Sequence, residues 1–126
     1  MNSSILFVKC PMFDETIDRH PDIRRRIIDR MKDFVEVKTR DSRARFGSND
    51  TPLIAAGHYG GLSHANVTQD YRVFYSKESH DPVIVRLYAV ITHVEAGIAT
   101  PPNIKRQKTM AMKMKGQIKW EVFVPD

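Results

Sequence analysis

Cysteine is nearly absent from this chain of 126 residues, which contains only Cys10. A lone cysteine cannot close an internal disulfide, and it cannot supply the thiolate cluster of a structural metal site. Its apolar neighbours Phe7 and Val8 indicate a buried thiol rather than a nucleophile. The cysteine content therefore excludes a disulfide-stapled scaffold and is typical of a reducing compartment.

Long hydrophobic runs are missing as well. Residues 1–4 carry no basic segment of a signal peptide, and no stretch reaches the roughly 20 apolar residues of a membrane helix. The chain also lacks a phosphate-binding Gly-Lys-Ser/Thr loop, a dinucleotide fingerprint and a Gly-x-Ser-x-Gly elbow. We therefore expect a cytoplasmic protein with no membrane partner and no cofactor.

Acidic residues are absent between residues 96 and 120, although the whole chain carries 15 of them against 20 basic residues. Two interpretations of this stretch are open, a solvated surface and a polyanion-binding surface. On the second, we assign RNA binding to its basic side chains, Lys105, Arg106, Lys108, Lys113 and Lys115. A further basic group, at residues 24–30, is diluted by aspartates and predicts only a solvated helix face.

Hydrophobic periodicity predicts an α/β (α+β) fold in a single domain. We expect a small antiparallel sheet of four or so strands, with an N-terminal pair of helices packed on one face and short turns at residues 68–70 and 77–82. Asp14 or Thr16 is the expected cap of the first helix, and Pro21 opens the second. The expected helices cover residues 14–20, 21–39 and 102–115, and the expected strands cover residues 5–10, 53–58, 62–67, 71–77, 82–92 and 120–124, with a polar loop at residues 40–51.

Five polar side chains with acid, base or phosphate chemistry fall on or beside the expected central strands. They are His58, His64, Asp70, Arg72 and His93. Imidazoles have an unperturbed pKa of about 6.5, which suits proton transfer near neutral pH, and a guanidinium can grip phosphate bidentately. Histidines can also bind metal, but the surrounding arginine and lysine residues disfavour a cation. Taken alone, Arg72 is better explained as a surface charge on a plain β-strand.

The order of these elements resembles that of the RelE/ParE superfamily of bacterial toxins. Three stretches carry the likeness: Thr-Pro-Leu at residues 51–53 before a glycine-rich turn, Asp-Tyr-Arg-Val-Phe-Tyr at residues 70–75, and a last strand at residues 87–95 that ends in Thr-His-Val-Glu. The likeness covers residues 5–95. The histidines most resemble the YafQ-type branch, whose members use histidines and an aspartate.

The resemblance implies a metal-independent endoribonuclease that cuts mRNA, on the ribosome in many members, and is silenced by a cognate antitoxin protein. In this assignment His64 or Asp70 acts as the base, His93 protonates the departing 5′-oxygen, and Arg72 stabilises the phosphorane. His58 assists. The chain departs from the family in its polar loop and in a Lys-rich C-terminal extension that begins at about residue 97.

Two other functions use the same fold. One is a catalytically inactive scaffold that binds RNA or protein as an inhibitor, and the other is a ParE-like poison of DNA gyrase. A fold alone does not decide between them.

Overall fold

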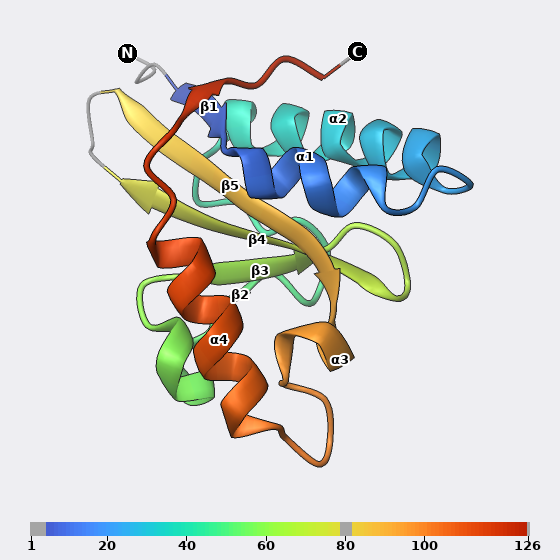
Figure 1. Ribbon diagram of the computed structural model, residues 1–126. Coiled ribbons are helices and arrows are strands. Elements are labelled where there is room, and N and C mark those ends of the chain that lie inside the picture. Colours follow the sequence, from blue (N-terminus) through green and yellow to red (C-terminus); the bar gives the residue numbers. More distant parts are fainter. Residues whose placement is uncertain (1–4, 79–81, 126) are drawn as a thin grey trace.

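The computed structural model describes residues 5–78 and 82–125, which fold around a six-stranded sheet (Figure 1). The strand order is β2-β3-β4-β5-β1-β6. The strands are β1 Ile5–Lys9, β2 Thr51–Pro52, β3 Ser63–Asn66, β4 Tyr71–Glu78, β5 Val83–Thr92 and β6 Glu121–Val122. The expected α/β (α+β) class is confirmed. The second expected turn falls largely on residues outside those described.

Helices occupy most of the positions that periodicity predicts. They are α1 Pro11–Asp18, α2 Arg24–Arg40, α3 His93–Ala96 and α4 Ile104–Lys115, together with a 3₁₀ helix η1 at Ile54–Tyr59. In α2 the buried residues Ile27, Met31, Phe34 and Lys38 recur at helical spacing along one stripe. Asn103 caps α4, because its side chain accepts a hydrogen bond from the Arg106 amide at 3.0 Å.

The sheet is mixed rather than wholly antiparallel. Strands β3, β4 and β5 form the expected antiparallel meander, but β1 pairs with β5 in parallel, with Ile5 opposite Val83 and Lys9 opposite Leu87. Parallel neighbours need a long crossover, and here the crossover spans everything between β1 and β5. Turn residues in the sequence indicate only strands that are joined by a short hairpin. They therefore could not indicate that β1 pairs with the distant strand β5.

Helices pack on both faces of the sheet. Phe34 of α2 meets Tyr75 of β4 edge-to-face, with ring centroids 5.2 Å apart. On the opposite face, Tyr59 of η1 packs on Phe74 at 5.4 Å, and the α4 residues Ala111 and Met114 are buried. In Figure 1, α1 and α2 lie on the upper side of β4 and β5, and α4 lies on the lower side, beside η1. The C-terminal extension therefore covers the face that the N-terminal helices leave open.

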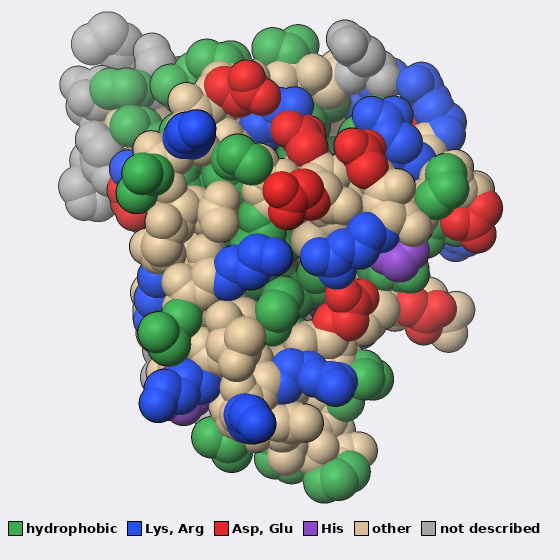
Figure 2. All heavy atoms as spheres, viewed as in Figure 1, with side chains coloured by type: hydrophobic (Ala, Val, Ile, Leu, Met, Phe, Trp, Pro, Cys, Tyr) green, Lys and Arg blue, Asp and Glu red, His purple; other side chains and the backbone are tan. Residues whose placement is uncertain are grey.

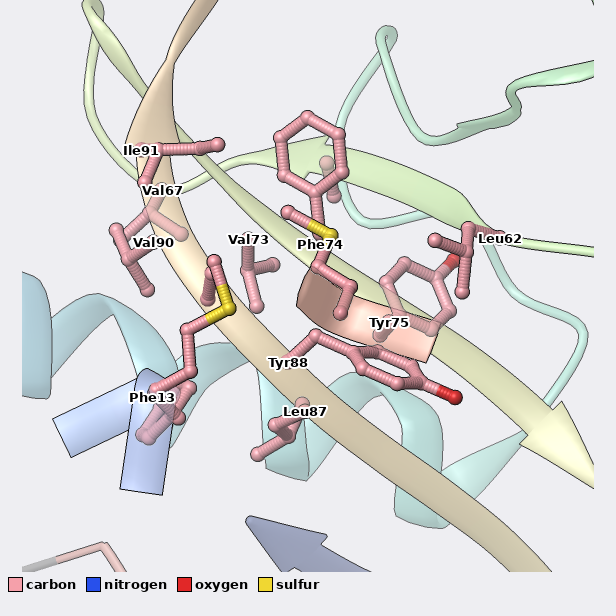
Figure 3. Packing of buried hydrophobic residues seen from close by; sticks show 14 of the residues in the cluster. Phe13, Leu62, Val67, Val73, Phe74, Tyr75, Leu87, Tyr88, Val90 and Ile91 are labelled. Atoms are coloured by element: carbon pink, nitrogen blue, oxygen red, sulfur yellow. The ribbon is translucent and has the colours of Figure 1, made fainter. Parts of the chain in front are cut away.

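The hydrophobic core runs through the middle of the sheet (Figure 3). The view labels residues from α1, β4 and β5 that converge on one cluster, among them Phe13, Val73 and Leu87. Burying such side chains stabilises the fold by about 1.5–3 kcal/mol each relative to leaving them exposed. The β4–β5 register shifts between Phe74 and Tyr75, whose partners are Ala89 and Leu87, so Tyr88 is an extra residue on β5.

The prediction that Asp14 or Thr16 caps the first helix is wrong. The helix starts three residues before Asp14, because Pro11 occupies its first turn, where the missing amide proton costs nothing. Thr16 is instead buried within α1. Its hydroxyl donates to the Met12 carbonyl at 2.9 Å and accepts from the Val90 amide at 3.0 Å. This side chain thereby joins α1 to β5.

The strand expected over residues 53–58 is also wrong. Leu53 precedes the helix η1, which takes up the rest of that range, and only Thr51 and Pro52 belong to the strand that pairs with β3. Gly57 and Gly61 adopt positive φ angles of 59° and 87°, which break an extended chain and suit close turns. The buried Tyr59 hydroxyl donates to the Ala96 carbonyl at 2.6 Å and so fixes η1 beside α3.

The polar loop at residues 41–50 is anchored by a buried ion pair. Lys38 of α2 and Asp50 are 2% and 4% exposed at their side chains, and they form a direct salt bridge. Asp50 also accepts hydrogen bonds from the Tyr75 hydroxyl and from the Phe46 amide. The loop thus ends at a fixed point directly before β2.

Candidate active site

Arg72 lies in the middle of the meander, on the face that α4 covers. It is directly opposite Asn66 on β3 and Ile91 on β5. Cross-strand partners point to the same face, so Arg72 shares its face with Asn66 and, two residues away, with His64. β4 pairs with β5 along its whole length, so the strand that carries Arg72 lies beside the strand that ends directly before His93, as expected.

His93 does not continue β5 as the sequence interpretation assumed; it is the first residue of the short helix α3. The side chain of Thr92 accepts a hydrogen bond from the Glu95 amide at 3.1 Å, and its hydroxyl donates to the Glu95 carboxylate at 3.4 Å. Thr-x-x-Glu is a capping box, a helix-start signal that the residues at 92–95 carry. The helix ends at Gly97, whose φ of 76° suits glycine. This turn aims the His93 ring back over the sheet.

The rings of His64 and His93 stack on one another. Their centroids are 5.5 Å apart and their planes differ by 22°. The two residues come from β3 and from the end of β5, so their rings meet above the intervening strand β4. Phe74 of β4 supports the pair from below, with its ring edge-to-face against His64 at 5.7 Å.

Four buried side-chain atoms in the described ranges have no hydrogen-bond partner, and all of them belong to this cluster. They are His64 Nδ1, Asn66 Oδ1, Arg72 Nε and His93 Nε2. Buried polar atoms in proteins are nearly always satisfied, so four in one place require an explanation. Buried groups left without a partner in this way occur at strained or catalytic sites and where a water or an ion binds.

Burial and positive charge act on the two histidines in the same direction. Burial lowers the pKa of His64 below its ordinary value, and the nearby Arg72 guanidinium lowers it further. Burial likewise lowers the pKa of His93, with Arg72 and His64 as additional causes. Near neutral pH both rings are therefore neutral in the free protein. A neutral imidazole can accept a proton, and bound anionic phosphate would favour a protonated ring beside it.

An open hollow of about 410 Å³ lies beside the cluster at the end of the sheet. Its lining consists of Gln69, Asp70, Tyr71, Arg72, Thr92, His93 and Val94. Asp70 is exposed on its rim, in the turn between β3 and β4. Arg72 Nη1 donates to the Gln69 carbonyl at 2.9 Å, which holds the guanidinium at the mouth of the hollow.

The structure brings together four of the five residues that the sequence singled out. His64, Arg72 and His93 form the cluster, and Asp70 stands beside it. His58 lies exposed on η1, where its carbonyl oxygen accepts a hydrogen bond from Lys115 of α4 at 2.7 Å. None of the contacts found among the described residues joins His58 to the histidine pair. The sequence pattern does not single out Asn66, although this residue lies two positions from His64 and therefore on the same face of the expected strand.

The basic residues of α4 form an exposed surface next to the cluster. Lys105, Arg106, Lys108, Lys113 and Lys115 are all exposed. Arg106 Nη1 donates to the Val94 carbonyl at 3.0 Å, which places the start of α4 directly beside His93. Figure 2 shows Lys and Arg side chains gathered over the lower part of this face, where α4 lies, and acidic side chains gathered over α1.

Two absences hold for the part of the chain that the structure covers. No group of three or more His, Cys, Asp or Glu side chains there is arranged to hold a metal ion. Of the helices in residues 5–78 and 82–125, none is long and apolar enough to cross a membrane.

Comparison with known proteins gives one informative result. Neither a protein-family model nor a curated protein matches the chain. Among solved structures, the chain is similar to the "YoeB/ParE toxin from Agrobacterium tumefaciens", with a TM-score of 0.55 and 14% sequence identity. The likeness covers 71% of this chain and 98% of the toxin, so this chain contains the toxin's fold and further residues besides. The chain thus shares the fold of this toxin structure.

Proposed function

We propose that this protein is a toxin-type, metal-independent endoribonuclease that cleaves mRNA. The observation that carries the proposal is the cluster of unpartnered buried atoms on His64, Arg72 and His93, of which Arg72 and His93 line an open hollow. Fold likeness to a toxin supports it. A scaffold without chemistry has no need of two imidazoles and a guanidinium that each keep one buried nitrogen without a hydrogen-bond partner.

The proposed reaction is attack by a ribose 2′-hydroxyl on the adjacent phosphorus. The new bond joins the 2′-oxygen to phosphorus, and the bond between phosphorus and the 5′-oxygen breaks. His64 accepts the proton of the attacking hydroxyl, with Asp70 on the rim as the alternative base. His93 donates a proton to the departing 5′-oxygen. The products are a 2′,3′-cyclic phosphate and a 5′-hydroxyl.

Arg72 carries the electrostatic part of the mechanism. Its guanidinium lies between the strands that carry the two histidines and provides a buried, unpartnered Nε–H. A pentacoordinate phosphorane is more negative than the phosphodiester, so a fixed cation beside it stabilises the transition state more than the substrate. His58 lies farther along the same face and would act only as an assisting residue.

The basic surface of α4 is the proposed path of the RNA strand. Its exposed side chains start beside His93, at Arg106, and continue along the helix to Lys115. Lysine and arginine contacts to phosphates give affinity without sequence preference. We propose the ribosome as the place of cleavage and a cognate antitoxin as the natural inhibitor, in the cytoplasm, as for the histidine-using YafQ-type branch.

Substitution of the cluster residues tests the proposal. We expect His93→Ala to reduce cleavage about 10²–10⁴-fold, the usual range for a general acid. Arg72→Ala should cost about 10²–10³-fold, as for a lost oxyanion donor. Cleavage is measured by primer extension on translated message and on free RNA, with thermal melting of each variant to verify folding.

Arg26→Ala serves as the matched control, because Arg26 is an exposed arginine on α2. Full cleavage by both the His93 and Arg72 variants would remove the catalytic assignment. Salt-sensitive RNA binding with no cleavage products, unchanged in these variants, would identify an inactive binding scaffold. Inhibition of DNA gyrase without RNA cleavage would identify a gyrase poison.

A further inference from the structure

Asn66 is the member of the cluster to which the proposed mechanism assigns no role. It lies directly opposite Arg72 in the β3–β4 ladder and two residues from His64, on the same face of the sheet. Its side-chain Oδ1 is buried and accepts no hydrogen bond from the described residues. The neighbouring Arg72 Nε–H is buried and unpaired as well. The free protein therefore contains a buried unused acceptor on Asn66 and a buried unused donor on the cross-strand residue Arg72.

A hydroxyl group matches this pair of unused atoms. It can donate its hydrogen to Oδ1 and accept the Nε–H on its own oxygen. A phosphate oxygen only accepts, so it would satisfy the arginine and leave the amide oxygen buried without a donor. On a single-stranded nucleic acid, the hydroxyl that lies closest to a phosphate is the ribose 2′-hydroxyl.

We infer that Asn66, together with the Nε–H of Arg72, binds a ribose 2′-hydroxyl and selects RNA over DNA. This hydroxyl belongs to a nucleotide next to the cleaved bond. The attacking hydroxyl must give its own hydrogen to the base, so that hydrogen is not available to Oδ1. The inference rests on the proposed function, which makes RNA the ligand, but its consequence is a binding preference rather than a reaction rate.

The preference is measured with a single-stranded RNA 12-mer and its 2′-fluoro counterpart, which keeps an RNA-like sugar but lacks the hydroxyl hydrogen. A His93→Gln background keeps the RNA intact during the measurement. We expect this parent to bind RNA about three- to tenfold more tightly than the 2′-fluoro strand, the usual net effect of one hydrogen bond. Adding Asn66→Ala should bring the ratio of the two dissociation constants close to one.

Asn66→Asp is the second variant, because a carboxylate keeps an acceptor oxygen at the same place. Its added negative charge should weaken binding to both strands, while the ratio between them persists. Asn49→Ala, which removes an exposed carboxamide, should change neither affinity nor ratio. Thermal melting of every variant verifies that the fold is intact.

An unchanged ratio in the Asn66→Ala variant, or no preference in the parent, would overturn the inference. Cleavage by the unsubstituted protein is scored separately. A chain that cleaves RNA normally but shows no Asn66-dependent preference contradicts the inference alone. A chain that shows the preference but never cleaves contradicts the proposed function alone.

Discussion

At the scale of single residues, the stacked imidazoles of His64 and His93 are the most informative feature. Because the two rings lie so close to each other and to a guanidinium, protonating both imidazoles at once is unfavourable. Such a pair holds one proton at most under ordinary conditions, as acid–base catalysis by two groups requires. The same arrangement has a consequence for stability, independent of any reaction.

Stability should fall in mildly acidic solution because of this pair. The folded-state pKa of each histidine lies below its unfolded value of about 6.5, so the unfolded chain takes up protons first as the pH drops. The contribution of the pair is therefore complete above about pH 6.5 and is lost as the pH falls toward the lowered folded-state pKa values. Urea unfolding between pH 7 and pH 5 measures this loss.

A variant carrying both His64→Gln and His93→Gln should lose less unfolding free energy over that range than the unsubstituted protein. His58→Gln, at an exposed position outside the histidine pair, is the matched substitution control. Identical pH dependence in the double variant and the unsubstituted protein would contradict the shifted pKa values.

The sequence predicts the positions of site residues correctly where they lie on strands. It does not predict the direction of a side chain that lies in the turn after a strand. Arg72 and His64 were assigned to the correct strands, and register then set them on one face. His93 was assigned to the end of β5, yet its ring direction depends on the Thr92–Glu95 capping box, which was interpreted as a strand end. Asn66 was passed over because an amide carries no charge, and only its burial without a partner revealed it.

At the scale of elements, the buried Lys38–Asp50 pair determines how the polar loop is held. The pair joins α2 to the residue that precedes β2, and the hydroxyl of Tyr75 donates to the same carboxylate. An ion pair that is almost completely removed from water stabilises only when both partners remain.

Asp50→Asn should therefore destabilise the protein by about 3–5 kcal/mol, because it leaves the Lys38 ammonium buried without a counter-charge. The matched change at an exposed ion pair, Asp33→Asn beside Arg30, should cost about 0.2–1 kcal/mol. Replacing both partners, as Lys38→Met with Asp50→Leu, should recover part of the loss. Chemical denaturation measures all three, and equal losses at the buried and exposed sites would contradict this assignment.

The sequence predicts where the two longest helices end, but it does not predict which strands pair with one another. The apolar stripe of α2 and the Gly116 end of α4 are local signals, and both helices end within one residue of their expected positions. The parallel pairing of β1 with β5 and the packing of α4 on the second face are non-local. No short segment of the sequence specifies such contacts, because they depend on how whole elements fill the core.

At the scale of the whole molecule, the excess of basic over acidic residues predicts salt-dependent binding. The chain carries a formal net charge of +5, and the exposed face of α4 holds lysines without an acidic neighbour along the helix. Each phosphate contact on a single strand contributes about 0.7 to the slope of log affinity against log salt.

Replacing Lys108 and Lys113 by Gln should reduce that slope by about 1.4 if each contacts one phosphate. Arg26→Gln with Arg43→Gln removes the same charge from other exposed positions and should leave the slope nearly unchanged. Fluorescence anisotropy with a single-stranded RNA over a series of salt concentrations gives the slope. An equal reduction in both double variants would indicate attraction to net charge rather than a defined path along α4.

The position of β1 and β6 in the sheet also determines how the protein would be oriented on a solid support. Ile5 lies opposite Val83 at the start of β5, and the Phe123 amide donates to the Phe7 carbonyl, so both ends of the described chain lie at one end of the molecule (Figure 1). His93 follows the other end of β5, ten residues away, which is about 30 Å of extended strand. A molecule attached to a bead or sensor chip through either terminus would thus present its hollow to the solution, which suits capture of long RNA from cell extracts.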